Sequence, residues 1–166
     1  MSNNKGKDGE MRVLRLLTHV VEAEEDCDIT RHTNTNTADG GADLVFEHPK
    51  GILSRIKNIA SDTGAQETTD PKDTQRVKTR IDVKTTSEKI SPDTVDKFAG
   101  DVRRNPDCFG HVLMGGVDLS LLARAKFNEI QQAQAEVGKC VTYIPNGGIE
   151  RLEQHYKALP APSNGD

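Results

Sequence analysis

Hydrophobic residues recur along this chain at two spacings, one typical of helices and the other of strands. Between residues 9 and 25 they return every three or four positions, as Leu14, Leu17 and Val21 do, which predicts an amphipathic helix. Glu10 lies on the same stripe, one turn before Leu14, so we expect its carboxyl group to face inward. Similar patterns predict further helices at residues 92–104, 119–137 and 149–156.

Short apolar or alternating runs between these helices predict strands. They cover residues 28–33, 41–47, 77–85, 111–114 and 140–144. Residues 33–39 are rich in Thr and Asn and are expected to form a loop. Residues 48–75 are rich in Pro, Gly, Thr, Asp and Ser, so we expect a surface insertion there with one or two helical turns at most.

The order of these elements predicts an α/β fold with three layers, in which helices cover both faces of a central mixed sheet. One domain is expected over residues 8–156, with a disordered tail at 157–166. No apolar run reaches the roughly 18 residues that cross a bilayer, and the charged N-terminus lacks a signal-peptide core. The 3 cysteines form no Cys-x-x-Cys pair, which favours reduced thiols over a zinc site. We therefore expect a cytoplasmic protein without a membrane partner.

Two acidic positions give the sequence its candidate chemistry. Asp43 follows a glycine pair in one predicted strand, and Asp82-Val83-Lys84 lies within another. Because strand side chains alternate between faces, Asp82 and Lys84 are expected to share one face. Carboxylates bind Mg²⁺, which prefers oxygen ligands, and a lysine beside them can stabilise the oxygens of a phosphate under attack. The pattern therefore predicts a metal-dependent nuclease site.

In this site Asp43, Asp82 and Glu10 are the predicted metal ligands, and all three are predicted to be catalytic together with Lys84. Mg²⁺ is the expected cofactor, with Mn²⁺ as a substitute. Each residue also has an ordinary structural interpretation. Asp43 can end a turn after the glycines, the Asp82 and Lys84 side chains can form a surface ion pair, and Glu10 can favour a helix start.

The charge distribution supports a nucleic-acid partner only locally. The whole chain has a net charge of -4, which argues against coating nucleic acid through bulk positive charge. Residues 50–104, however, hold 12 Lys/Arg against 9 Asp/Glu, and this excess surrounds the acid-x-lysine motif. Contacts to the DNA backbone are expected from Lys78, Arg80, Lys89 and Lys97.

These motifs resemble those of the PD-(D/E)xK nuclease superfamily, and of its Mrr-like restriction endonuclease family in particular. The run Asp39-Gly40-Gly41-Ala42-Asp43 is similar to that family's Asp-Gly-Gly-x-Asp strand, and Ile81-Asp82-Val83-Lys84 is similar to its acid-x-lysine strand. The helix that contains Glu10 is similar to the family's opening helix, whose glutamate helps the metal site. The resemblance implies a restriction-endonuclease-like core with Asp43 as the principal ligand.

The resemblance also implies a Mg²⁺-dependent DNA endonuclease of restriction or mobile-element type. Two alternatives stay open: a nuclease of the Holliday-junction resolvase type, and a non-catalytic DNA-binding or interaction module on a nuclease fold. Asp82 stands where Mrr-like members commonly carry glutamine, whereas the wider superfamily carries Asp or Glu. Because one such site cuts one strand, we expect a homodimer. The sequence shows no separate target-reading domain, so a targeting subunit is a further expected partner.

Overall fold

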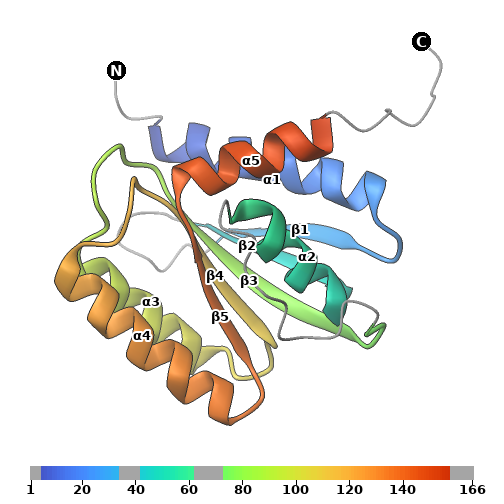
Figure 1. The fold of residues 1–166 in the computed structure, drawn as a ribbon. Helices are drawn as coiled ribbons and strands as arrows, with labels where there is room; N and C mark the ends of the chain where they lie inside the picture. The colour runs from blue at the N-terminus through green and yellow to red at the C-terminus, as the bar shows by residue number, and fades with distance from the viewer. Residues whose placement is uncertain (1–4, 34–41, 62–72, 158–166) are drawn as a thin grey trace.

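A mixed β-sheet forms the centre of the computed structural model, with helices on both of its faces (Figure 1). The structure describes residues 5–33, 42–61 and 73–157, although not the side chains of residues 5–7, 32–33 and 42–43. Most of the predicted loop at 33–39, and the predicted tail beyond Lys157, lie outside the described residues.

The elements alternate between helix and strand along most of the chain. In order they are α1 (Lys5–Ala23), β1 (Asp28–Thr33), β2 (Ala42–Pro49), α2 (Lys50–Ala60), β3 (Arg76–Lys84), α3 (Pro92–Arg104), β4 (Gly110–Gly115), α4 (Leu121–Glu136), β5 (Cys140–Ile144) and α5 (Asn146–Lys157). Every predicted helix and strand is present, with ends displaced by at most four residues.

The five strands lie in the sheet in the same order as in the chain. The first three are antiparallel neighbours, whereas β3, β4 and β5 are parallel. Parallel neighbours need a crossover connection, and α3 and α4 supply the two crossovers on one face of the sheet. The predicted α/β fold with a central mixed sheet is therefore confirmed.

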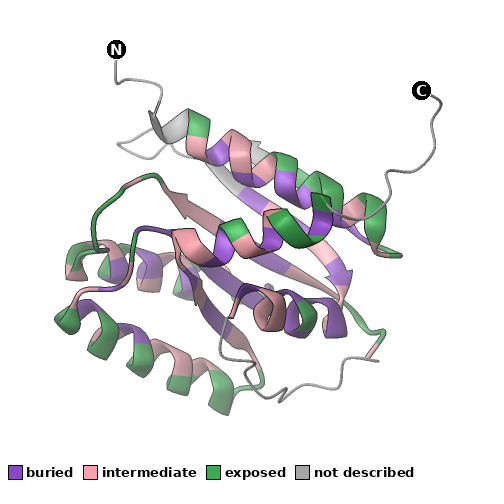
Figure 2. Ribbon diagram, turned by 45° about the horizontal axis from the view of Figure 1, so that its top comes forward, coloured by how far each residue is buried: buried purple, intermediate pink, exposed green. Residues whose placement is uncertain are grey.

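Each face of the sheet has its own apolar core. Leu17 of α1, Phe46 of β2 and Met114 of β4 belong to the core beneath α1, α2 and α5. On the other face, Phe98 of α3 and Phe127 of α4 stack with ring centroids 5.7 Å apart over the sheet. Figure 2 shows the buried sides of the helices turned towards the strands. Burial of each such side chain contributes about 1.5–3 kcal/mol, and the two cores together hold the helices in place.

Helix α2 corrects the prediction of a surface insertion over residues 48–75. Ile52, Leu53 and Ile56 are buried in the core beneath α1 and α5, so residues 50–60 belong to the packed domain. The backbone N–H groups that open this helix donate to the carbonyls of Gln75 and Asp73, which lie at the far end of the same segment. Because the partners of these N–H groups lie more than 20 residues away, the sequence around residue 50 gives little sign that a helix begins there.

Helix α3 shows the opposite case, since its start is determined locally. The Ser91 hydroxyl accepts a hydrogen bond from the Thr94 N–H at 3.3 Å, and Pro92 occupies the first turn. Both are the signals that predicted a helix at 92–104. Within the residues that the structure describes, no helix combines the length and the apolar character needed to cross a membrane.

Two histidines are buried in the sheet as neutral rings. His48 Nδ1 donates to the Pro49 carbonyl at 2.6 Å, and the Thr79 hydroxyl donates to its Nε2 at 2.7 Å. Neither ring nitrogen of His111 has a hydrogen-bond partner among the described residues. The pKa of both histidines is lowered to about 4, mainly by burial, and the nearby Arg80 cation contributes to the shift of His111.

We expect the folded state to lose stability as the pH falls from 8 to 5. In this range the unfolded chain protonates its histidines near pH 6.5, whereas the folded chain holds His48 and His111 neutral down to about 4. Each of the two therefore contributes a loss of roughly 1–2 kcal/mol at pH 5.

The variant His111→Leu should lose less stability between pH 8 and pH 5 than the wild type, by the roughly 1–2 kcal/mol that one buried histidine contributes. At pH 8 it should leave the free energy of unfolding unchanged or higher, because it removes two buried nitrogens without partners. Urea unfolding at pH 5 and pH 8 measures both effects. His19→Gln, on the exposed face of α1, is the control. Its free energy of unfolding should change between pH 8 and pH 5 as much as that of the wild type. If the free energy of unfolding of His111→Leu changed as much between pH 8 and pH 5 as that of the wild type, His111 would not be a buried neutral histidine.

Candidate active site at the end of strand β3

The structure brings Asp82 and Lys84 together at the end of β3. The Lys84 Nζ lies 3.5 Å from Asp82 Oδ1, and the two side chains are 30% and 14% exposed. Strand alternation turns both towards the same face, while Ile81 between Arg80 and Asp82 faces the core beneath α1. A lysine and a carboxylate on the same face of the strand are what the acid-x-lysine pattern predicts.

The Asp82 carboxylate forms an ion pair with the buried cation of Arg80. Arg80 is only 2% exposed, and its Nη2 lies 3.7 Å from Asp82 Oδ2 and 3.3 Å from Asp101 Oδ2 on α3. Arg80 thus joins β3 to α3 under the candidate site. This position removes Arg80 from the predicted set of DNA contacts, because a guanidinium enclosed by its own chain does not reach a phosphate in solvent.

Asp43 occupies the neighbouring position on β2. The β2–β3 ladder ends with the pair Leu44 and Ile81, and Asp43 and Asp82 are the next residues along the two strands. At backbone level the two predicted ligands therefore adjoin, although they are 39 positions apart in the chain. The side chain of Asp43 lies outside the description.

Glu10 lies at the same end of the sheet but on the other face. It is 8% exposed, as its place on the inward stripe predicts. Its Oε1 accepts hydrogen bonds from Arg31 Nε and Nη2 at 3.0 and 2.9 Å. Arg31 pairs in register with Leu44, a residue of the α1-side core, whereas Asp82 pairs with Leu113 of the α3-side core. Glu10 thus lies on the α1 side of the sheet and Asp82 on the α3 side, and the role of Glu10 as a metal ligand stays a prediction.

The backbone of Lys84 in β3 lies in close contact with Gly115 of β4. Gly115 ends β4 with a φ of 122°, and a Cβ added there would lie 1.9 Å from the carbonyl oxygen of Lys84. The Tyr143 hydroxyl donates to the Gly115 carbonyl at 2.6 Å, and burial raises the pKa of Tyr143 to about 12. Only glycine allows β4 to approach the end of β3 this closely.

The described residues fit a metal ion only in part. They contain no group of three or more His, Cys, Asp and Glu side chains that could hold one. Asp82 is the one predicted ligand whose described side chain faces the site, and Mg²⁺ commonly takes one or two carboxylates and keeps several waters. The described side chains thus supply one carboxylate for such an ion.

The remaining predicted DNA contacts are spread along the surface. Lys89, in the loop that follows β3, and Lys97, on α3, are exposed. Lys78 lies towards the opposite end of β3, where its Nζ is 3.0 Å from Asp107 Oδ2. This pairing raises the pKa of Lys78 and lowers that of Asp107. Lys89 and Lys97 therefore remain candidates near the site, and Lys78 belongs to a different part of the surface.

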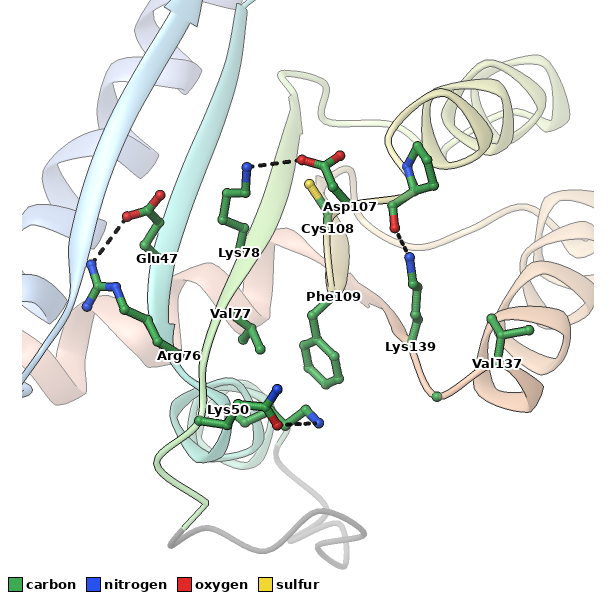
Figure 3. A pocket seen from close by; sticks show the side chains of 13 residues that line it. Glu47, Lys50, Arg76, Val77, Lys78, Asp107, Cys108, Phe109, Val137 and Lys139 are labelled. Carbon is green, nitrogen blue, oxygen red and sulfur yellow. Dashed lines mark hydrogen bonds and ion pairs between the residues drawn. The ribbon is translucent and has the colours of Figure 1, made fainter.

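That part of the surface is a groove that the sequence did not reveal. It is a hollow of about 600 Å³ at the start of β3, β4 and β5, and Figure 3 shows its lining. The basic residues around it are Lys50, Arg76, Lys78 and Lys139, and Phe109 lies among them. These residues come from four separate segments, so no local motif connects them.

Comparisons of this chain with protein-family models, with curated proteins and with solved structures find no match.

Removal of the buried cation beneath the site should be costly. Arg80→Met would leave the Asp82 and Asp101 carboxylates close together without the guanidinium between them, so we expect a loss of about 3–5 kcal/mol in the free energy of unfolding. Arg104→Met removes another cation from Asp101, but Arg104 is 69% exposed, and the expected loss is at most about 1 kcal/mol. Unfolding in guanidinium chloride measures both variants. Similar losses in the free energy of unfolding would contradict the structural role of Arg80.

The close approach of β4 to Lys84 can be tested with a pair of glycines. Gly115→Ala combines a strained φ with a backbone clash and should lower stability by about 3 kcal/mol or prevent folding. Gly138→Ala has a similar φ of 78° but nothing within 4 Å of the added Cβ, so we expect a loss of about 1 kcal/mol. Thermal unfolding distinguishes them. A Gly115→Ala protein as stable as Gly138→Ala would contradict the packing.

Proposed function

We propose that this chain is a Mg²⁺-dependent endonuclease that hydrolyses DNA phosphodiester bonds, of restriction or mobile-element type. The observation that carries the proposal is the Asp82–Lys84 pair, 3.5 Å apart and partly accessible at the end of β3. A carboxylate and an amine at this distance can serve a metal ion and a phosphate at once.

The order of the elements supports the same proposal. An opening helix carries Glu10, β2 carries Asp43, β3 carries Asp82 and Lys84, and a helix then leads to a parallel strand. This is the order that the resemblance to the Mrr-like family implies. The proposal therefore includes a PD-(D/E)xK, restriction-endonuclease-like core within the observed α/β fold.

Each residue has a defined task in this proposal. Asp82, oriented by the buried Arg80, and Asp43 beside it would hold the metal ion. Lys84, whose side chain is 30% exposed, would donate hydrogen bonds to an attacking water or to the phosphoryl oxygens. A bound Mg²⁺ would lower the pKa of its water and withdraw charge from the scissile phosphate. Lys89 and Lys97 would contact the DNA backbone on either side.

A second candidate is a non-catalytic DNA-binding module, and one observation favours it. The described carboxylates are already satisfied by cations of the chain itself, Asp82 by Arg80 and Lys84, and Glu10 by Arg31. Such pairs can be purely structural. Metal-dependent cleavage by the purified protein distinguishes the two functions.

We expect the protein to cleave plasmid DNA with Mg²⁺ or Mn²⁺ and not with EDTA. Lys84→Ala and Asp82→Asn should each lower the rate at least about a hundredfold, because each removes a group that acts on the developing charge. Asp96→Asn is the matched control, since Asp96 is an exposed α3 carboxylate paired with Lys126, and it should cleave normally. Circular dichroism establishes that all variants are folded.

The comparison of substrates then assigns the type of nuclease. Preference for linear duplex favours the restriction type, and preference for a four-way junction favours the resolvase type. Double-strand cutting needs two sites, so we propose a homodimer on DNA, to be measured by sedimentation; a separate targeting subunit remains a proposed partner. Absence of cleavage by wild-type protein, with DNA binding intact, would support the non-catalytic module instead.

A further inference from the structure

The groove at the start of β3 is one half of a longer basic surface. A second hollow of about 380 Å³ adjoins the first, and both are lined by Lys50, Phe109, Gly138 and Lys139. The second hollow adds Lys57 of α2. Together they make an elongated groove around Phe109, wider than a single small ligand needs.

Three lysines of this groove make their hydrogen bonds to neutral groups of the described residues, although the charge of Lys139 also lowers the pKa of Asp107. Lys50 Nζ donates to the Gln75 side-chain carbonyl at 3.3 Å and lies 4.9 Å from the centre of the Phe109 ring. Lys139 donates to the Pro106 carbonyl. Lys57 Nζ has Cys140 Sγ at 3.9 Å. None of the three forms an ion pair with a described carboxylate.

Their neighbours in the groove differ in this respect. Arg76 forms ion pairs with Asp26, Asp28 and Glu47, and Lys78 pairs with Asp107. The two hollows are also lined by the acidic residues Glu47, Asp73 and Asp107. The chain thus holds two of these five groove cations in ion pairs, whereas the other three ammonium groups make hydrogen bonds to neutral groups around one aromatic ring. Ammonium groups in this state attract phosphates, whose binding releases counterions from a nucleic acid.

We propose that this groove binds a strand of nucleic acid through its phosphates, at a site separate from Asp82 and Lys84. Phe109 lies between the cations and offers a surface against which a base can pack, as in other single-strand grooves. The groove lies at the start of β3 and the candidate active site at its end, and Lys78 and Asp82 are roughly 13 Å apart along the strand at about 3.3 Å per residue. The choice of nucleic acid among polyanions rests on the proposed function, whereas the anion site rests on the groove alone.

The experiment measures binding without cleavage. A fluorescein-labelled 20-nucleotide single strand is titrated in EDTA, by anisotropy, at several salt concentrations. The double variant Lys50→Gln/Lys139→Gln, which changes the two lysines shared by both hollows, should bind about tenfold more weakly. The slope of log affinity against log salt should fall by about 1.4, since each phosphate contact on a single strand contributes about 0.7. Lys57→Gln should add a further, smaller loss.

The control variant Arg15→Gln/Lys157→Gln makes the same change in net charge on exposed positions of α1 and α5, and should bind like the wild type. Lys50→Arg/Lys139→Arg keeps both charges and should also retain binding. Equal weakening in the test and control variants would overturn the proposal, as would absence of binding by the wild-type protein. Binding of ATP or tripolyphosphate with no binding of the strand would overturn the nucleic-acid assignment.

The two proposals fail independently. Asp82→Asn should keep its affinity for the strand in EDTA, because that residue lies outside the groove. Loss of cleavage in Asp82→Asn with normal strand binding supports both proposals. Strand binding by a wild-type protein that does not cleave plasmid would contradict the proposed nuclease and leave the groove assignment standing.

Discussion

The arrangement of the candidate site depends on one buried cation. The Arg80 guanidinium is almost wholly enclosed, and it lies between carboxylates of β3 and α3. A charge removed from water must be paired, so β3 and α3 can pack only with Asp82 and Asp101 turned towards Arg80. This pairing fixes the Asp82 side chain at the edge of the α3-side core, and Lys84 follows from strand alternation two positions later. The candidate chemistry is therefore built on a structural ion pair.

The sheet has two ends of different character. At the carboxyl end of β3, a carboxylate and an amine lie side by side, and Gly115 lets β4 approach their backbone. At the other end, residues at the starts of three strands and of α2 surround Phe109 with basic side chains, of which Lys50, Lys57 and Lys139 form no ion pair with a described carboxylate. One end offers metal and phosphate chemistry, and the other offers electrostatic attraction for a polyanion. Separation along a rigid strand keeps the two properties independent.

Local patterns in the sequence predicted most of the elements because the signals were themselves local. The start of α3 is stabilised by a hydrogen bond between Ser91 and Thr94, which are three residues apart. The burial of Glu10 follows from its position on the inward stripe of a helix. Helix α2 was predicted only as one or two helical turns of a surface insertion, because its first N–H groups are satisfied by Gln75 and Asp73, across a segment that is not periodic. Glu10 was correctly predicted to be buried, but helical spacing does not say on which face of the sheet a helix packs.

The sequence by itself determined the alternation that turns Asp82 and Lys84 the same way, and the order of helices and strands, since both follow from interactions between near neighbours. Only the tertiary structure decided that Arg80 is buried rather than exposed to DNA, that Glu10 pairs with Arg31, and that lysines from α2 and from the start of β5 surround Phe109. These outcomes depend on which faces pack together and which strand ends meet. Packing is settled by contacts between residues far apart in the chain, which no local pattern encodes.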